Sequence, residues 1–240
     1  MNIASLARRG IAALAAGTVL GFGSVATASP VTLVPTGFAN GSEQFNVSVP
    51  TALGTAPLPT GAFVGTIDDS PAPPPPKPLV FFCFELTQTF SFGTSYTYDD
   101  SVQTGGIYTT LSELFTEGFA TALDSTQNSA AFQLAIWEIL EEPAGTQKSL
   151  SPGADQGTFY VTNDHGNTAT VTAANALIAG LPPIGLYEIH LLSNDTNQNF
   201  IYGTPIPPLQ QVPEPAPLLL FAAALAAMLF GLRSASRRRS

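Results

Sequence analysis

Leu-Val-Phe-Phe-Cys-Phe-Glu-Leu, residues 79–86, is the most apolar run in the body of this 240-residue chain. Its residues favour β structure, and apolar side chains fall at successive positions rather than at alternate ones. The run therefore predicts a central strand that is buried on both faces. Proline recurs through the segment before it, 70–78, and proline cannot join a sheet interior, so this segment is predicted to be an extended loop.

Other segments around this run alternate between apolar and polar residues, with the period of a half-buried strand. This alternation predicts strands near 45–49, 90–98 and 186–192, and the glycines that bound 61–65 predict another strand there. Residues 194–199 are polar and predict a turn.

Between these strands the pattern changes to the period of a helix. Thr110 and Glu113 form a capping box at the start of the first predicted helix. A second helix is predicted from about 130 to 142, stopped by Pro143, and a third over 169–179. The predicted fold class is α+β, with a β-rich sandwich or barrel-like core and a helical insertion.

The charges are unevenly placed along the chain. The formal net charge is −9, but Lys77 and Lys148 are the only basic residues between 29 and 212, against sixteen acidic ones. An exposed body this acidic repels phosphate backbones, so nucleic acid is not an expected partner. One cysteine and two distant histidines cannot build a Cys/His zinc site, and no glycine-rich phosphate loop is present. No metal or cofactor is expected.

Residues 1–28 have the three parts of a secretory signal peptide. Arg8 and Arg9 precede a short apolar stretch, and Ala26 and Ala28 give the small-x-small pattern of a cleavage site. Because the stretch is short and contains glycines, it predicts a cleaved signal rather than a permanent anchor. Export through the Sec machinery is expected, because residues 10–12 lack the aromatic and basic residues that follow the arginine pair of a Tat signal.

The other end of the chain carries a second apolar segment. Residues 217–232 are uncharged and long enough for a marginal transmembrane helix. Basic residues follow it and predict a cytoplasmic C-terminus. The flanking residues are Val212, Pro213, Glu214 and Pro215 before the helix and Arg233, Arg237, Arg238 and Arg239 after it.

This order of Pro-Glu-Pro, apolar helix and terminal arginines resembles the PEP-CTERM sorting signal of Gram-negative bacteria that make extracellular polysaccharide. The resemblance implies recognition by a membrane exosortase, cleavage near Glu214 and transfer of the body to the cell surface or matrix. A plain single-span anchor is the alternative. The expected organisation is a signal peptide over 1–28, an exported ectodomain over 29–208 and a sorting signal over 209–240.

Two residues of the body stand out chemically. Cys83 is the only cysteine of an exported chain, so it has no disulfide partner within the chain. Gln133 lies in the middle of an apolar helix and needs a hydrogen-bond partner if it is buried. Phe82-Cys83-Phe84 and the segment 132–137, Phe-Gln-Leu-Ala-Ile-Trp, resemble the two signatures of bacterial thioester domains.

In that family the Cys thiol attacks the Gln carboxamide, releases ammonia and leaves an internal thioester. Some members then capture an amine or hydroxyl on a target surface. The resemblance thus implies a surface or matrix protein that is adhesive rather than an enzyme, with an exosortase, surface polysaccharide or another amine- or hydroxyl-bearing target as partners. The alternative is a structural or non-covalent carbohydrate-binding module, in which Cys83 is a buried thiol and the aromatics of 81–98 form a core or a sugar-stacking face.

Six further residues and one segment are candidates for a role in chemistry. Glu85 and Glu138 are candidate proton shuttles or plain structural carboxylates. His165 is interpreted as a turn residue and His190 as a strand residue, neither with a paired nucleophile nearby in the sequence. Asp155, Asp164 and 194–199 have two interpretations. They are oxygen ligands for Ca²⁺ or, more simply, residues of polar turns.

Overall fold

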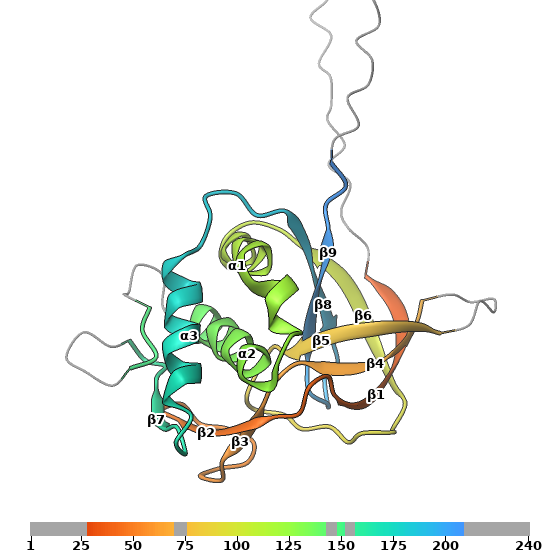
Figure 1. Cartoon of the computed structure of the whole chain (residues 1–240). Helices are drawn as coiled ribbons and strands as arrows, with labels where there is room; N and C mark the ends of the chain where they lie inside the picture. Colours follow the sequence, from red (N-terminus) through yellow and green to blue (C-terminus); the bar gives the residue numbers. More distant parts are fainter. Residues whose placement is uncertain (1–27, 70–75, 143–147, 152–156, 209–240) are drawn as a thin grey trace, which may run out of the picture.

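The computed structural model describes residues 28–69, 76–142, 148–151 and 157–208, and within them six antiparallel strands close into a barrel (Figure 1). Neighbouring strands follow the order β1-β4-β5-β9-β8-β6, and the ring closes between β6 and β1. The barrel strands are β1 (Ser29–Phe38), β4 (Phe63–Asp68), β5 (Lys77–Cys83), β6 (Tyr96–Gln103), β8 (Tyr187–Ser193) and β9 (Phe200–Pro205).

The helices are inserted between β6 and β8 and lie together on one side of the barrel (Figure 1). A small sheet of order β3-β2-β7 accompanies them. The prediction of a β-rich core with a helical insertion is confirmed, and the core is a closed barrel rather than a sandwich. The inserted helices are α1 (Ile107–Ala122), α2 (Thr126–Glu141) and α3 (Thr168–Ala179), and the small sheet contains β2 (Glu43–Val47), β3 (Leu58–Thr60) and β7 (Val161–Asn163).

Strand β5 is central and buried on both faces, as its apolar run predicts. It lies between β4 and β9 in the barrel. Phe81 packs among aromatic rings of the barrel strands, with its ring centroid 4.8 Å from that of Phe200. Phe82 points the other way and packs 4.9 Å from Phe132 of α2. Both phenylalanines are fully buried, so this one strand joins the barrel core to the helical layer.

The proline-rich segment differs from its prediction as a loop through residue 78. Lys77 and Pro78 begin β5, and Pro78 pairs with Thr66 of β4. Strand β9 pairs with β5 only at Phe82 and Cys83, so Pro78 lies where β5 has a single neighbour. Proline is tolerated at such an edge position because no second ladder needs its amide. Residues 70–75 are outside the described part of the chain.

The first helix does not begin at the predicted capping box. It starts at Ile107, behind Gly105 and Gly106, and its N-terminus has no side-chain cap. The hydroxyl of Ser112 instead donates to the backbone oxygen of Tyr187 at 2.5 Å and ties the helix to β8. The signal was misleading because a Thr-x-x-Glu pattern also fits the interior of a helix.

The second helix is longer at its start than predicted, and the third is nearly as predicted. Helix α2 begins at Thr126 because Ser125 caps it, accepting a hydrogen bond from the Asn128 amide at 3.1 Å. It ends at Glu141, just before Pro143. Helix α3 differs from the predicted 169–179 by one residue at its start.

The chain enters and leaves the barrel at one end, and Cys83 lies toward the other. The start of β1 and the end of β9 lie on the same side of the barrel, at the top of Figure 1. Cys83 pairs with Phe200, at the beginning of β9, and so lies toward the opposite end. The predicted signal peptide and the predicted sorting signal lie outside the described residues, apart from Ala28. Among the described residues, no helix has the length and apolar character needed to cross a membrane.

The close packing of Gly65 in β4 against β1 leaves no room for a larger side chain. A Cβ at this position would lie 2.5 Å from the backbone oxygen of Val34 in β1, which cannot move without disturbing the barrel. Gly65→Ala should lower the free energy of unfolding by about 1–3 kcal/mol, measured by urea denaturation. Gly37→Ala is the matched control, because a Cβ there meets nothing within 4 Å. A Gly65→Ala barrel as stable as the Gly37→Ala one would contradict this packing.

Candidate functional site

Cys83 and Gln133 meet at the open edge of a barrel strand. Cys83 is the last residue of β5, and Gln133 lies in the middle of α2. Strand β4 begins at Phe63, which pairs with Phe81 in the antiparallel register of β4 with β5. Strand β4 therefore does not extend far enough to pair with Cys83. The edge of Cys83 next to β4 therefore has no strand partner, and its backbone groups must find another.

The carboxamide of Gln133 supplies both missing hydrogen bonds. The amide of Cys83 donates to Oε1 of Gln133 at 2.8 Å, and Nε2 of Gln133 donates to the backbone oxygen of Cys83 at 3.0 Å. Gln133 is 1% exposed and Cys83 9%. The sequence prediction that Gln133 needs a partner is confirmed, and the partner is Cys83.

A second side chain of α2 lies one turn earlier and pairs a backbone amide of the segment just before β4. The hydroxyl of Ser129 accepts a hydrogen bond from the amide of Ala62 at 2.7 Å, and both residues are fully buried. Ser129 and Gln133 are four residues apart and so share one face of the helix. Together they fix α2 to the barrel at the point where β4 and β5 separate.

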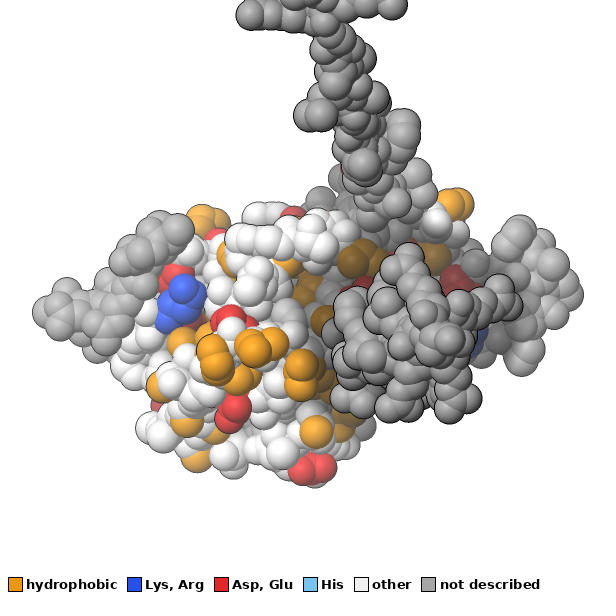
Figure 2. Space-filling view, turned by 90° about the horizontal axis from the view of Figure 1, so that it is seen from above, with side chains coloured by type: hydrophobic (Ala, Val, Ile, Leu, Met, Phe, Trp, Pro, Cys, Tyr) orange, Lys and Arg blue, Asp and Glu red, His pale blue; other side chains and the backbone are white. Residues whose placement is uncertain are grey.

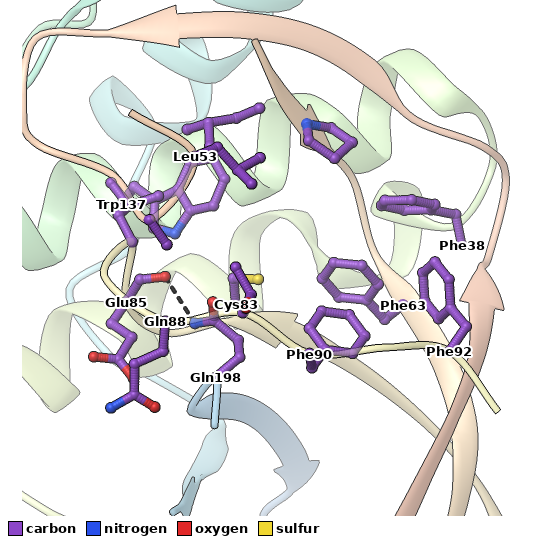
Figure 3. A pocket seen from close by; sticks show the side chains of 15 residues that line it. Phe38, Leu53, Phe63, Cys83, Glu85, Gln88, Phe90, Phe92, Trp137 and Gln198 are labelled. Carbon is purple, nitrogen blue, oxygen red and sulfur yellow. Dashed lines mark hydrogen bonds between the residues drawn. The ribbon is translucent and has the colours of Figure 1, made fainter. Parts of the chain in front are cut away.

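Beside this contact lies a cavity of about 240 Å³. Figure 3 shows Cys83 near its middle, with Phe38, Phe63, Phe90 and Phe92 on one side. The other side is lined by Trp137 and Leu53 and by three polar residues, Glu85, Gln88 and Gln198 (Figure 3).

The thiol of Cys83 is held in its neutral form. Burial raises the pKa of Cys83, and the nearby negative charge of Glu85 raises it further. Attack by the sulfur therefore requires a base that removes its proton. Glu85 lines the same cavity, with its carboxylate accepting hydrogen bonds from Thr87 at 2.9 Å and from the amide of Asn199 at 3.2 Å.

The other carboxylate considered as a proton shuttle, Glu138, does not line this cavity. It is fully buried in α2, and neither of its carboxylate oxygens makes a hydrogen bond of good geometry with a described residue. Burial raises the pKa of Glu138 from 4.5 to about 7. The backbone of Ser149 lowers this pKa, whereas the charge of Glu142 raises it further.

The remaining sequence candidates are turn and barrel residues. His165 has a positive φ of 51° and lies in a turn, where its ring nitrogen is 2.6 Å from Oδ1 of Asn46. Asp164 accepts hydrogen bonds from Gly166 and Thr168 in the same turn. Asp155 is outside the described residues, and no group of three His, Cys, Asp or Glu side chains suited to a metal occurs within them.

His190 belongs to a polar network that the sequence analysis missed. Its ring nitrogens lie 3.1 Å from Oδ1 of Asp100 and 3.2 Å from the hydroxyl of Thr204. Tyr202 donates to the other oxygen of Asp100 at 2.6 Å, and its ring stacks on the imidazole at 4.4 Å. These residues come from β6, β8 and β9, so no short spacing in the sequence could indicate them. The network joins three neighbouring barrel strands.

No family model, no curated protein and no solved structure matches this chain.

The contact between Gln133 and Cys83 predicts a large structural effect. Gln133→Met keeps the side-chain volume but leaves the amide and the carbonyl of Cys83 buried without partners. The free energy of unfolding should fall by about 2–5 kcal/mol, because each unpaired group costs about 1–3 kcal/mol. Denaturant unfolding measures this loss. Gln44→Met, at an exposed position of β2, should change stability by less than about 0.5 kcal/mol, and equal effects of the two substitutions would refute the prediction.

Glu138 predicts a dependence of stability on pH. Since its pKa is about 7 in the folded chain and 4.5 ordinarily, the unfolded state loses the proton first as pH rises. The contribution of Glu138 to the free energy of unfolding is thus fully present below pH 4.5, and about 3 kcal/mol of it is lost by the time the pH passes 7. Glu138→Gln should remove this loss, so that the variant is more stable than the unchanged protein at pH 8 but not at pH 4.5. The measurement is urea unfolding at both pH values.

The control for this pH dependence is Glu117→Gln, at an exposed position of α1. This variant should retain the fall in stability between pH 4.5 and 8. If Glu138→Gln retains it as well, the loss comes from another group.

Proposed function

We propose that the chain is an exported cell-surface or extracellular-matrix protein, sorted by an exosortase and adhesive through an internal thioester between Cys83 and Gln133. The observation that carries the proposal is the direct contact between the Gln133 carboxamide and the backbone of Cys83, at 2.8 and 3.0 Å. This contact holds the group to be attacked beside the residue that carries the nucleophile.

The hydrogen bonds also favour the reaction electronically. The amide of Cys83 donates to Oε1 of Gln133, the atom that gains negative charge when the sulfur attacks the carboxamide carbon. In serine proteases the amide of the nucleophilic residue has the same function in the oxyanion hole. The arrangement therefore polarises the carbonyl before reaction.

The bond changes are simple. A bond forms between Sγ of Cys83 and Cδ of Gln133, and the bond between Cδ and Nε2 breaks. The thiol proton passes to the departing nitrogen, which leaves as ammonia, so no oxidant or reductant is needed. Glu85, the only charged residue among the described ones that line the cavity, is the base proposed to carry that proton.

The rest of the molecule is compatible with a reactive acyl group. Within the described residues the only amines are those of Lys77 and Lys148, and Lys77 is paired with Asp69 at 2.8 Å. Figure 2 shows few basic side chains on the visible face, among neutral and acidic ones. The acyl group thus has few nucleophiles on its own surface to react with. Cys83 also lies away from the end of the barrel where β9 leads toward the tail (Figure 1).

A second candidate function uses the same contact differently. The two hydrogen bonds of Gln133 by themselves complete the edge of β5, and the raised pKa of Cys83 favours a stable thiol. The chain would then be a structural or non-covalent binding module.

Intact-mass spectrometry of the exported protein separates the two candidates. A thioester lowers the mass by one ammonia and leaves no free thiol on the denatured protein. Cys83→Ala and Gln133→Ala should each prevent the loss of ammonia. An unmodified mass together with a free thiol rules out the thioester.

The sorting proposal has its own test. In a host that lacks the exosortase, the precursor should retain the arginines after residue 232 and accumulate in the inner membrane. Fractionation and mass analysis of the C-terminus measure both effects. An unchanged C-terminus and location would mean that the tail is only an anchor.

A further inference from the structure

The cavity beside Cys83 contains polar atoms that no described residue satisfies. Trp137 is 2% exposed, and its Nε1–H has no hydrogen-bond partner. Oε1 of Gln88 is also buried without one. Because such a group costs free energy when it is left unpaired, the Trp137 donor indicates a missing partner in the cavity that this residue lines.

A third polar group is fixed in place by the fold. Gln198 is 4% exposed, and its Nε2 donates to the backbone oxygens of Glu85 at 2.8 Å and Asn199 at 3.1 Å. These bonds leave its Oε1 free to accept, and Figure 3 shows the Gln198 amide next to Cys83. The cavity therefore offers a donor from Trp137 and an acceptor from Gln198.

The polar groups and the rings occupy different parts of the cavity. Figure 3 shows Phe63, Phe90 and Phe92 on one side of Cys83, and Glu85 and Gln198 toward the other. Two apolar residues that line the cavity are unusually exposed for their type, Leu53 at 43% and Phe92 at 44%. A complementary ligand has an apolar face and a polar edge.

The volume limits the ligand to a small one. At about 240 Å³ the cavity lies just below the range of roughly 300–1,000 Å³ that is typical of small-molecule sites. One six-membered ring with its substituents is of the right size. A longer ligand could place only one of its units inside.

From this complementarity we propose that the cavity binds one pyranose unit of a polysaccharide, with a ring face on the phenylalanines and hydroxyls on Trp137 and Gln198. A hydroxyl both donates and accepts, so it can satisfy the Trp137 donor and the Gln198 acceptor. A lysine ammonium only donates and would leave Trp137 unpaired. Binding requires no thioester, because every group named here belongs to the folded chain.

For the covalent reaction, which rests on the proposed function, the same cavity selects the acceptor. A sugar hydroxyl attacks Cδ of Gln133 in the thioester, an ester bond forms, and the bond to Sγ breaks. The hydroxyl proton passes to the sulfur, which regenerates the thiol of Cys83. The product is an ester, which hydroxylamine cleaves under mild conditions, rather than an amide.

The binding test uses Cys83→Ala in the exported protein, because this variant cannot form a thioester. The probes are the methyl pyranosides of glucose, galactose, mannose and N-acetylglucosamine, with Nα-acetyllysine as the comparison, followed by saturation-transfer NMR and calorimetry. At least one pyranoside should bind saturably and more tightly than Nα-acetyllysine. Absence of saturable pyranoside binding, or tighter binding of Nα-acetyllysine, overturns the proposal.

Substitutions locate the binding in the cavity. Trp137→Phe keeps a ring but removes the donor, so the Kd should rise about fivefold, the equivalent of one hydrogen bond of about 1 kcal/mol. Phe92→Ala, at an exposed position on the rim, should also weaken binding severalfold without disturbing the fold. Tyr108→Phe, beside a different cavity, is the control and should leave the Kd unchanged. An unchanged Kd in Trp137→Phe and Phe92→Ala overturns the proposed site.

The two proposals fail in different ways. If the unsubstituted protein shows no loss of ammonia but pyranosides bind, the thioester is refuted and the sugar site is supported. If ammonia is lost but no pyranoside binds, the thioester is supported and the sugar site is refuted. An adduct of the unsubstituted protein with a pyranoside that hydroxylamine releases supports both.

Discussion

Two backbone groups at the end of β5 determine how the barrel and the helices fit together. Beyond Phe63 the β4 neighbour is missing, and the amide and carbonyl of Cys83 would be buried without partners. The Gln133 side chain replaces the absent strand, and Ser129 supports it one helical turn earlier. Because these contacts require α2 to lie along this edge, they also fix Phe132 against Phe82 and bring Trp137 to the cavity. One amide side chain thus organises both the packing and the site.

The site combines features that stability alone does not require. The thiol is buried and neutral, and the Trp137 donor lacks a partner among the described residues. A chain optimised only for stability would fill such a cavity with apolar side chains or pair its polar groups. At the other end of the barrel the polar groups of Asp100, His190 and Thr204 are paired with one another, with Tyr202 completing the network. The contrast between a satisfied and an unsatisfied polar cluster distinguishes the structural end of the barrel from the candidate functional one.

The parts of this arrangement that could be predicted are those with strong local patterns. The run 79–86 indicated a strand buried on both faces, and the apolar stripe of α2 singled out Gln133 as a buried amide that needs a partner. Strands β1 and β9 were missed because Pro30, Pro35 and Gly203 weaken their local signal, whereas their pairing with distant strands stabilises them. The cavity was not predictable for a similar reason. Its walls come from separate segments, and the missing hydrogen bond of Trp137 depends on every neighbour of that residue.

The course of β9 has a mechanical consequence. This strand starts opposite Cys83 and runs toward the end of the barrel that leads to the tail, paired with β8 along its whole length from Phe200 to Pro205. In the proposed adhesive role, a pull between a target bound at the cavity and the chain that continues beyond β9 acts roughly along the strand. The hydrogen bonds of the β8–β9 ladder lie across that direction, so they are loaded together in shear instead of opening one after another. A barrel connected in this way resists extension much better than one whose terminal strand is peeled from its edge.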